Sequence, residues 1–163
     1  MPLLTLSIGS NVDSHTNVRV AVKKLQTHFP DLQCSTVFES EAVGFEGDNF
    51  LNLVASAQTD EPLESINTFL KELEDQLGRD RSQAKFSARP IDIDILTYGD
   101  EVGENHGIQL PRDEILKYAF VLQPLADLLP DESHPQSGEK YATLWQQFDQ
   151  ASQELWPIEF DWQ

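Results

Sequence analysis

Two acidic side chains interrupt an apolar stretch of the sequence, RPIDIDIL, in which Asp92 and Asp94 alternate with Ile91, Ile93 and Ile95. In a β-strand, residues i and i+2 point to the same face, so the two carboxylates project together from Cα atoms about 6.5 to 7 Å apart. Two ionised carboxylates this close repel each other and require a compensating cation. That cation is either an arginine, in a purely structural pairing, or a divalent metal. Carboxylate oxygens, completed by water and phosphate oxygens, are the usual ligands of Mg²⁺.

A cluster of basic residues precedes this strand. Of the 11 Lys and Arg residues of the chain, four fall between residues 79 and 89: Arg79, Arg81, Lys85 and Arg89. In a chain with a net charge of −17, such a cluster predicts a local anion site, although a solvated charged loop is the alternative. Mg²⁺ together with several arginines is what the transfer of a polyphosphate group needs, since both neutralise the charge that develops in the transition state.

The overall composition excludes several classes of protein. The net charge of −17 argues against binding of nucleic acid or an anionic membrane, because both favour basic surfaces. No apolar run approaches the roughly 20 residues of a membrane span, and the first residues lack the basic region of a signal peptide. The one cysteine, Cys34, forms no internal disulfide and is expected to be buried, in keeping with a cytoplasmic location.

Alternating apolar residues predict four strands, at 3–9, 33–39, 50–58 and 91–98. Two helices are predicted between them by helical spacing, one from Val18, Val22, Leu25 and Phe29, the other from Leu63, Ile66, Leu70, Leu73 and Leu77. We expect Ser14 or Thr16 to cap the first helix, and Pro62 and Gly78 to mark the start and end of the second.

The resulting order, β-α-β-β-α-β, is typical of a ferredoxin-like split βαβ core, an α+β fold with an antiparallel sheet and both helices on one face. After it we expect a polar loop at 100–109, a short helix from about Asp113, and a helix near 140–152 that forms a C-terminal helical extension. With no repeat and no boundary, residues 1–163 are predicted to form a single domain.

Five motifs in this order and spacing, SIGSN, VGFEGDNFLN, GRDR, RPIDIDIL and FVLQPLADLLP, resemble the 6-hydroxymethyl-7,8-dihydropterin pyrophosphokinase family up to about residue 130. Enzymes of that family act in folate biosynthesis, where they transfer the β,γ-diphosphate of ATP to the hydroxymethyl group of the pterin and release AMP. The resemblance implies a monomer with ATP and a reduced pterin as substrates, and two Mg²⁺ ions bound together with ATP.

It also implies roles for individual residues. Asp92 and Asp94 would bind the metal and, with Arg79 and Arg89, form the catalytic set. ATP would be bound by Glu74, Arg79, Arg81, Arg89, Ile95 and Arg112. The pterin would be bound by Ser40, Val43, Gly44, Phe50, Asn52, Phe86 and Phe120. Core packing is the alternative role for the aromatic residues, and a hydrogen bond at a strand edge is the alternative for Asn52.

The sequence departs from the family after Pro111. There the family usually has His, then Tyr, then Arg a few residues later, whereas this chain has Arg112, Asp113 and Tyr118. An acidic residue near a triphosphate is unfavourable. A pyrophosphokinase is the leading hypothesis, with a divergent paralogue that binds a pterin or nucleotide without efficient catalysis as the alternative. A ferredoxin-like module that only binds a metal or a protein is a third hypothesis.

Overall fold

The structure, a computed structural model, describes residues 1–41, 48–78 and 90–163. Its first half contains β1 (Leu3–Ser10), α1 (Ser14–His28), β2 (Gln33–Cys34), β3 (Val37–Ser40), β4 (Phe50–Gln58) and α2 (Leu63–Gln76). Its second half contains β5 (Asp92–Tyr98), β6 (Gly103–Asn105), β7 (Ile108–Leu110), the 3₁₀ turn η1 (Asp113–Leu116), α3 (Ala119–Leu128), α4 (Tyr141–Gln147), η2 (Gln150–Ser152) and β8 (Leu155–Ile158).

The main sheet confirms the ferredoxin-like prediction. Its strands lie in the order β5-β1-β4-β3-β8, with β2 also paired to β4, and the pairings are antiparallel. Strands β1 and β4 carry the longest stretches of buried residues, as expected of strands with neighbours on both sides. A second, two-stranded sheet joins β6 to β7.

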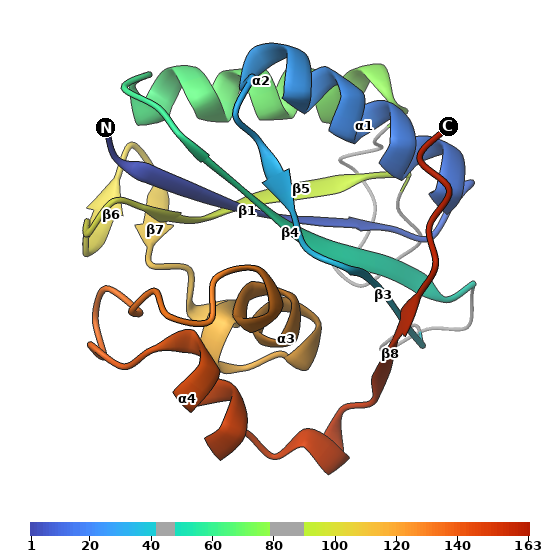
Figure 1. Ribbon diagram of the computed structural model, residues 1–163. Helices are drawn as coiled ribbons and strands as arrows, with labels where there is room; N and C mark the ends of the chain where they lie inside the picture. Colours follow the sequence, from blue (N-terminus) through green and yellow to red (C-terminus); the bar gives the residue numbers. More distant parts are fainter. Residues whose placement is uncertain (42–47, 79–89) are drawn as a thin grey trace.

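Helices α1 and α2 lie side by side across one face of the sheet (Figure 1). The main core fills the space between them and the strands, because alternate strand residues meet the apolar stripes of both helices. Its members include Leu4, Leu6, Ile8, Leu25, Leu53, Ile66, Leu70, Leu73, Ile91, Ile93 and Ile95. The isoleucines that alternate with the two aspartates therefore face the helices, as the sequence predicts.

Helices α3 and α4 cover part of the opposite face (Figure 1). A second core, built around Val54 and Leu96 of the sheet and the apolar residues of α3, fills this layer. It includes Tyr141, which is almost fully buried at the start of α4. The hydroxyl oxygens of the buried Thr5 and Thr97 lie 2.7 Å apart on the same side of the sheet. The candidate site lies on this same face of the sheet, at the start of β5.

Local features differ from the sequence predictions at several points. The residue that precedes α1 is Asp13, in a left-handed conformation with φ of 42° and no capping side-chain hydrogen bond, so the prediction of Ser14 or Thr16 as the cap is wrong. The strand expected at 33–39 is divided into β2 and β3. Gly78 ends the second helix as expected, with φ of 94°, which is strained for residues with a side chain.

The C-terminal region departs further. The polar loop expected at 100–109 contains the β6–β7 hairpin, and the helix expected near 140–152 is α4 followed by the short turn η2. The chain then forms β8, a strand that pairs with β3 and that the sequence analysis does not predict. The C-terminal extension is therefore partly a strand. No helix among the described residues is long and apolar enough to cross a membrane.

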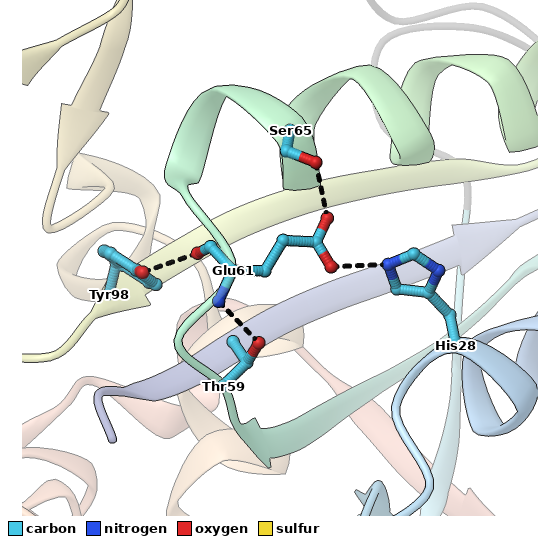
Figure 2. A network of polar contacts seen from close by, with 5 residues as sticks. All are labelled: His28, Thr59, Glu61, Ser65 and Tyr98. Atoms are coloured by element: carbon cyan, nitrogen blue, oxygen red, sulfur yellow. Dashed lines mark hydrogen bonds and ion pairs between the residues drawn. The ribbon is translucent and has the colours of Figure 1, made fainter.

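A polar network centred on Glu61 joins three elements at the end of the sheet where β4 and β5 terminate (Figure 2). One carboxylate oxygen lies 2.7 Å from Nε2 of His28, at the end of α1, and the other accepts a hydrogen bond from the hydroxyl of Ser65 in α2 at 2.8 Å. The main-chain carbonyl of Glu61 accepts from the hydroxyl of Tyr98 at 2.6 Å, and its N–H donates to Thr59 Oγ1 at 3.0 Å. We call these five residues the Glu61 network.

Candidate active site

The two aspartates of β5 lie on the face of the sheet opposite α1 and α2. Across β1, Asp92 is paired with Gly9 and Asp94 with Ser7. Both aspartates are half-buried, whereas Ile93 and Ile95 on either side of Asp94 are buried in the core below α1 and α2. The same-face geometry predicted from the alternation is confirmed.

A row of residues continues from Asp92 across the sheet. Gly9, in the SIGSN motif, is paired on its other side with Asn52 of β4, and Asn52 is paired with Phe38 of β3. A Cβ atom placed on Gly9 would lie 3.1 Å from Oδ1 of Asn52, closer than most side chains tolerate. The glycine therefore leaves space between Asp92 and the Asn52 amide.

Asn52 is 4% exposed and donates a hydrogen bond from Nδ2 to Oγ of Ser40 at 3.0 Å. Ser40 ends β3 and is paired with Phe50, the first residue of β4. The structure thus brings together three of the residues expected to bind the pterin. Asn52 thus makes a side-chain hydrogen bond to the last residue of β3, as in its alternative role at a strand edge, and this bond fixes the orientation of the amide.

Glu74 has a structural position that sequence reasoning did not anticipate. It is 4% exposed on α2, and its Oε2 accepts a hydrogen bond from the main-chain N–H of Ile93 at 2.7 Å. That N–H belongs to the residue between Asp92 and Asp94. Glu74 therefore ties α2 to β5 at the point where the strand presents the two carboxylates.

A β-bulge brings Arg112 to the site. The pairing of β1 with β5 shifts between Thr5 and Leu6, which leaves Leu96 without a partner residue in β1. The carbonyl of Leu96 accepts a hydrogen bond from the N–H of Arg112 at 2.8 Å. The Arg112 side chain then lies beside Asp94, with Nη2 3.7 Å from Oδ1, and its Nε donates to Oε1 of Glu114.

The electrostatics of this cluster favour an added cation. Burial, and next the charge of Asp92, raise the pKa of Asp94 to about 7. Arg112 acts in the opposite direction, while Glu114 and Glu74 add to the increase in pKa. Within the described part of the chain, three neighbouring carboxylates thus raise the pKa of Asp94 and one guanidinium group lowers it. A divalent cation between Asp92 and Asp94 would favour the ionised carboxylates.

Other expected site residues lie in less informative positions. Phe120 is half-buried in the first turn of α3, and its ring stacks on that of Tyr118 with centroids 5.0 Å apart. The side chain of Ile95 is buried on the opposite face, so the expected contact of Ile95 with ATP stays a prediction for its main chain. Asp113 is exposed and forms an ion pair with Lys117 at 2.9 Å.

Six expected residues lie outside the described part of the chain: Val43, Gly44, Arg79, Arg81, Phe86 and Arg89. Two contributors were missed by sequence reasoning. Gly9 lies within the SIGSN motif, but its role depends on its neighbours across the sheet. Glu114 follows Arg112 by two residues, and no pattern in the sequence indicates that their side chains meet.

The chain resembles known proteins over most of its length. The model of the family "7,8-dihydro-6-hydroxymethylpterin-pyrophosphokinase (HPPK)" matches residues 5–130. A 2-amino-4-hydroxy-6-hydroxymethyldihydropteridine pyrophosphokinase of Aquifex aeolicus is 36% identical over 137 residues, which are 83% of this chain and 85% of that protein. A folate synthesis bifunctional protein of Chlamydia caviae is 31% identical, over 85% of this chain but only 33% of its own length.

The fold agrees with this. The wild-type HPPK-DHPS crystal structure from Plasmodium falciparum superimposes with a TM-score of 0.69 at 13% identity, over 90% of this chain and 41% of that chain. The likeness to the larger proteins is therefore confined to a part of each. From the family match and the 36% identity to the Aquifex aeolicus enzyme, the chain belongs to the 7,8-dihydro-6-hydroxymethylpterin-pyrophosphokinase family.

Proposed function

We propose that this chain transfers a diphosphate group from ATP to the hydroxymethyl group of 6-hydroxymethyl-7,8-dihydropterin and releases AMP, a step of folate biosynthesis. The observation that carries the proposal is the arrangement of Asp92 and Asp94 on the face of the sheet opposite α1 and α2, with β1 between them and Asn52, which is bonded to Ser40. The two carboxylates and an amide of fixed orientation thus lie on strands β5 and β4, which are separated by β1. Family membership supplies the reaction that such a site performs.

The residues present suit a metal ion whose coordination shell is completed by oxygen atoms of the substrate. No group of three or more His, Cys, Asp or Glu side chains within the described ranges could hold a metal ion by itself. Two aspartates with water and phosphate oxygens suit Mg²⁺, which prefers few protein carboxylates and retains other oxygen ligands. We propose that Asp92 and Asp94 hold two Mg²⁺ ions with ATP; when bound, these ions would stabilise negative charge and lower the pKa of the pterin hydroxyl.

Each of the chain's own groups has a positional task. Glu74, through the N–H of Ile93, holds the strand so that both carboxylates face the substrates. Arg112 is anchored by its main chain to Leu96 and lies close enough to Asp94 to approach the phosphates there. Asn52, held by Ser40, offers an amide of fixed orientation to the polar edge of the pterin. Positioning of this kind contributes much of the rate of group transfer.

We assign binding of ATP and pterin to the residues predicted from the family motifs, including the six outside the described ranges. Asp113 is a poor candidate for direct phosphate contact, since it is exposed and paired with Lys117. We also propose that the chain acts as a monomer in the cytoplasm. Its charge of −17 supports small-molecule substrates rather than nucleic acid.

The decisive experiment incubates the protein with Mg²⁺, ATP and 6-hydroxymethyl-7,8-dihydropterin and separates the nucleotides. We expect AMP to form in an amount equal to the pterin diphosphate, and only when all three components are present. Formation of ADP would indicate transfer of a single phosphoryl group. No nucleotide turnover by a folded protein would contradict the proposal.

A further inference from the structure

The chain returns to the candidate site after the family match ends at residue 130. Residues 150–163, which we call the C-terminal strap, contain η2, β8 and the last five residues. In Figure 1 the strap, in red, runs from the end of α4 along β3 to the side of α1. At α1, Nε of Arg19 donates to the carbonyl of Asp161 at 2.9 Å, and the ring of Phe160 stacks on His15 with centroids 5.4 Å apart. The strap is therefore anchored at its far end.

Gln153, between η2 and β8, makes two hydrogen bonds to the turn that precedes α3. Its Oε1 accepts from the N–H of Ala119 at 2.9 Å, and its Nε2 donates to the carbonyl of Lys117 at 2.9 Å. Ala119 is the first residue of α3, where N–H groups lack helical partners, and Tyr118 before it makes no capping side-chain hydrogen bond. Gln153, although distant in sequence, thus caps the N-terminus of α3. Phe120 lies in the first turn of this helix.

Two residues further along, the strap contacts the other side of the pterin site. Leu155 in β8 is paired with Ser40 in β3, and Ser40 accepts the hydrogen bond from Asn52. The three residues 153–155 therefore connect the turn at 117–120 to the end of β3. Residues expected to bind the pterin lie on both of these segments.

We propose that Gln153 is a positioning residue for the pterin: by holding the 117–119 turn to the strap, it fixes the placement of Phe120 relative to Ser40 and Asn52. This inference rests on the proposed function, because it requires that the pterin bind between these segments. An amide is the side chain that suits both contacts, since it accepts from Ala119 and donates to Lys117. A carboxylate retains only the first contact, and an apolar side chain of similar length retains neither.

Two substitutions separate positioning from simple stabilisation. Gln153→Met keeps the length and loses both hydrogen bonds. Gln153→Glu keeps the acceptor for Ala119, and its negative charge is favourable at a helix N-terminus, but it loses the donor to Lys117. Glu154→Gln, at the exposed neighbouring position, is the matched control. For each protein we would measure the pterin dissociation constant directly, the KM values for pterin and ATP by AMP formation, and unfolding in urea.

We expect Gln153→Met to weaken pterin binding about tenfold, as two neutral hydrogen bonds predict, while the KM for ATP changes less than about twofold. Gln153→Glu should unfold at a urea concentration close to that of the unmodified protein and still bind the pterin roughly threefold to fivefold more weakly. Glu154→Gln should match the unmodified protein in all respects. A purely structural role would instead shift the unfolding curves and leave the dissociation constant of the folded protein unchanged.

Unchanged pterin affinity in folded Gln153→Met, or equal losses for pterin and ATP, would overturn the inference. Failure of the proposed function has a different signature, because binding is measured apart from turnover. If the unmodified protein binds the pterin but makes no AMP, the proposed reaction is wrong, and the dissociation constants still test Gln153. If the unmodified protein binds no pterin, both proposals fail together.

Discussion

The two ends of the main sheet differ in how their half-buried carboxylates are compensated. At the Glu61 network, one carboxylate has a histidine on one oxygen and a serine hydroxyl on the other, and its main chain is hydrogen-bonded on both sides (Figure 2). At the candidate site, the charges of Asp92, Glu114 and Glu74 disfavour ionisation of Asp94, and among the described residues Arg112 is the cation that opposes them. The first arrangement is complete without a ligand and joins three elements. In the second, the ionised form of Asp94 is disfavoured and would gain from an added cation, and we infer that this is the functional feature.

The largest effect is expected when one charge is removed from the candidate site. Asp94→Asn should lower kcat/KM by at least about a thousandfold, because metal-based charge stabilisation contributes several kcal/mol and 1.36 kcal/mol corresponds to a factor of ten. The melting temperature of the metal-free protein should stay the same or rise, since a repulsion is removed. Asp92→Asn should behave likewise.

The matched control is Glu104→Gln, which removes an exposed carboxylate from β6 and should leave activity unchanged. A large loss of stability in metal-free Asp94→Asn would show instead that its pairing with Arg112 is structural. In that case the carboxylates of the candidate site, like Glu61, would serve mainly to stabilise the fold.

The pH dependence of stability is the next largest effect. In the folded metal-free protein the pKa of Asp94 is raised from 3.8 to about 7, so between these values the folded chain binds more protons than the unfolded chain. This carboxyl therefore contributes stability at low pH that is lost as the pH rises through 7. Relative to Asp94→Asn, the free energy of unfolding should fall by about 2 kcal/mol between pH 5 and pH 8. Parallel curves for the two proteins, from urea unfolding in EDTA, would contradict this.

At the opposite end, Glu61→Gln should lower the free energy of unfolding by about 1 to 2 kcal/mol, since it removes a charge-assisted contact with the half-buried His28. The activity per folded molecule should not change. Glu64→Gln is the control, because Glu64 is 73% exposed and its ion pair with His106 at 3.6 Å is expected to contribute little. Urea unfolding measures both. A loss of activity in folded Glu61→Gln would show that the two ends are coupled.

The smallest effect expected concerns long-range repulsion. With a net charge of −17, screening by salt should stabilise the folded chain, so the melting temperature should rise by a few degrees from low to about 0.5 M NaCl. Scanning calorimetry in EDTA measures this without metal effects. A flat or falling dependence would mean that local pairs such as those of the Glu61 network outweigh the net charge.

Sequence periodicity was sufficient for the core of the fold and for the direction of the two aspartates. Strands in a sheet repeat every two residues, so Ile93 and Asp94 are assigned to opposite faces once the strand is recognised. The contact of Arg112 with Asp94 could not be obtained in this way. It depends on a bulge at Leu96, and a bulge is set by the pairing of two strands rather than by the local pattern.

The C-terminal part was less predictable for a related reason. β8 has four residues, Leu155–Ile158, and contains a proline, so its sequence favours a loop. The strand forms because its main chain pairs with β3, a contact that the local sequence does not indicate. Similarly, Gly9 is a glycine because Asn52 lies beside it, a relation between strands that are more than 40 residues apart in sequence. The features that the sequence did not predict depend on contacts between strands that are distant in the sequence.

The two outer strands of the sheet, β5 and β8, also bear on how the protein avoids self-association. An exposed strand edge offers N–H and C=O groups to other chains and can start aggregation. On β8, Pro157 has no N–H to contribute to such a pairing. On β5, the Leu96 carbonyl is already bonded to the N–H of Arg112, and an approaching strand would meet the half-buried charges of Asp92 and Asp94. Both outer strands therefore offer fewer main-chain groups for pairing with a second molecule.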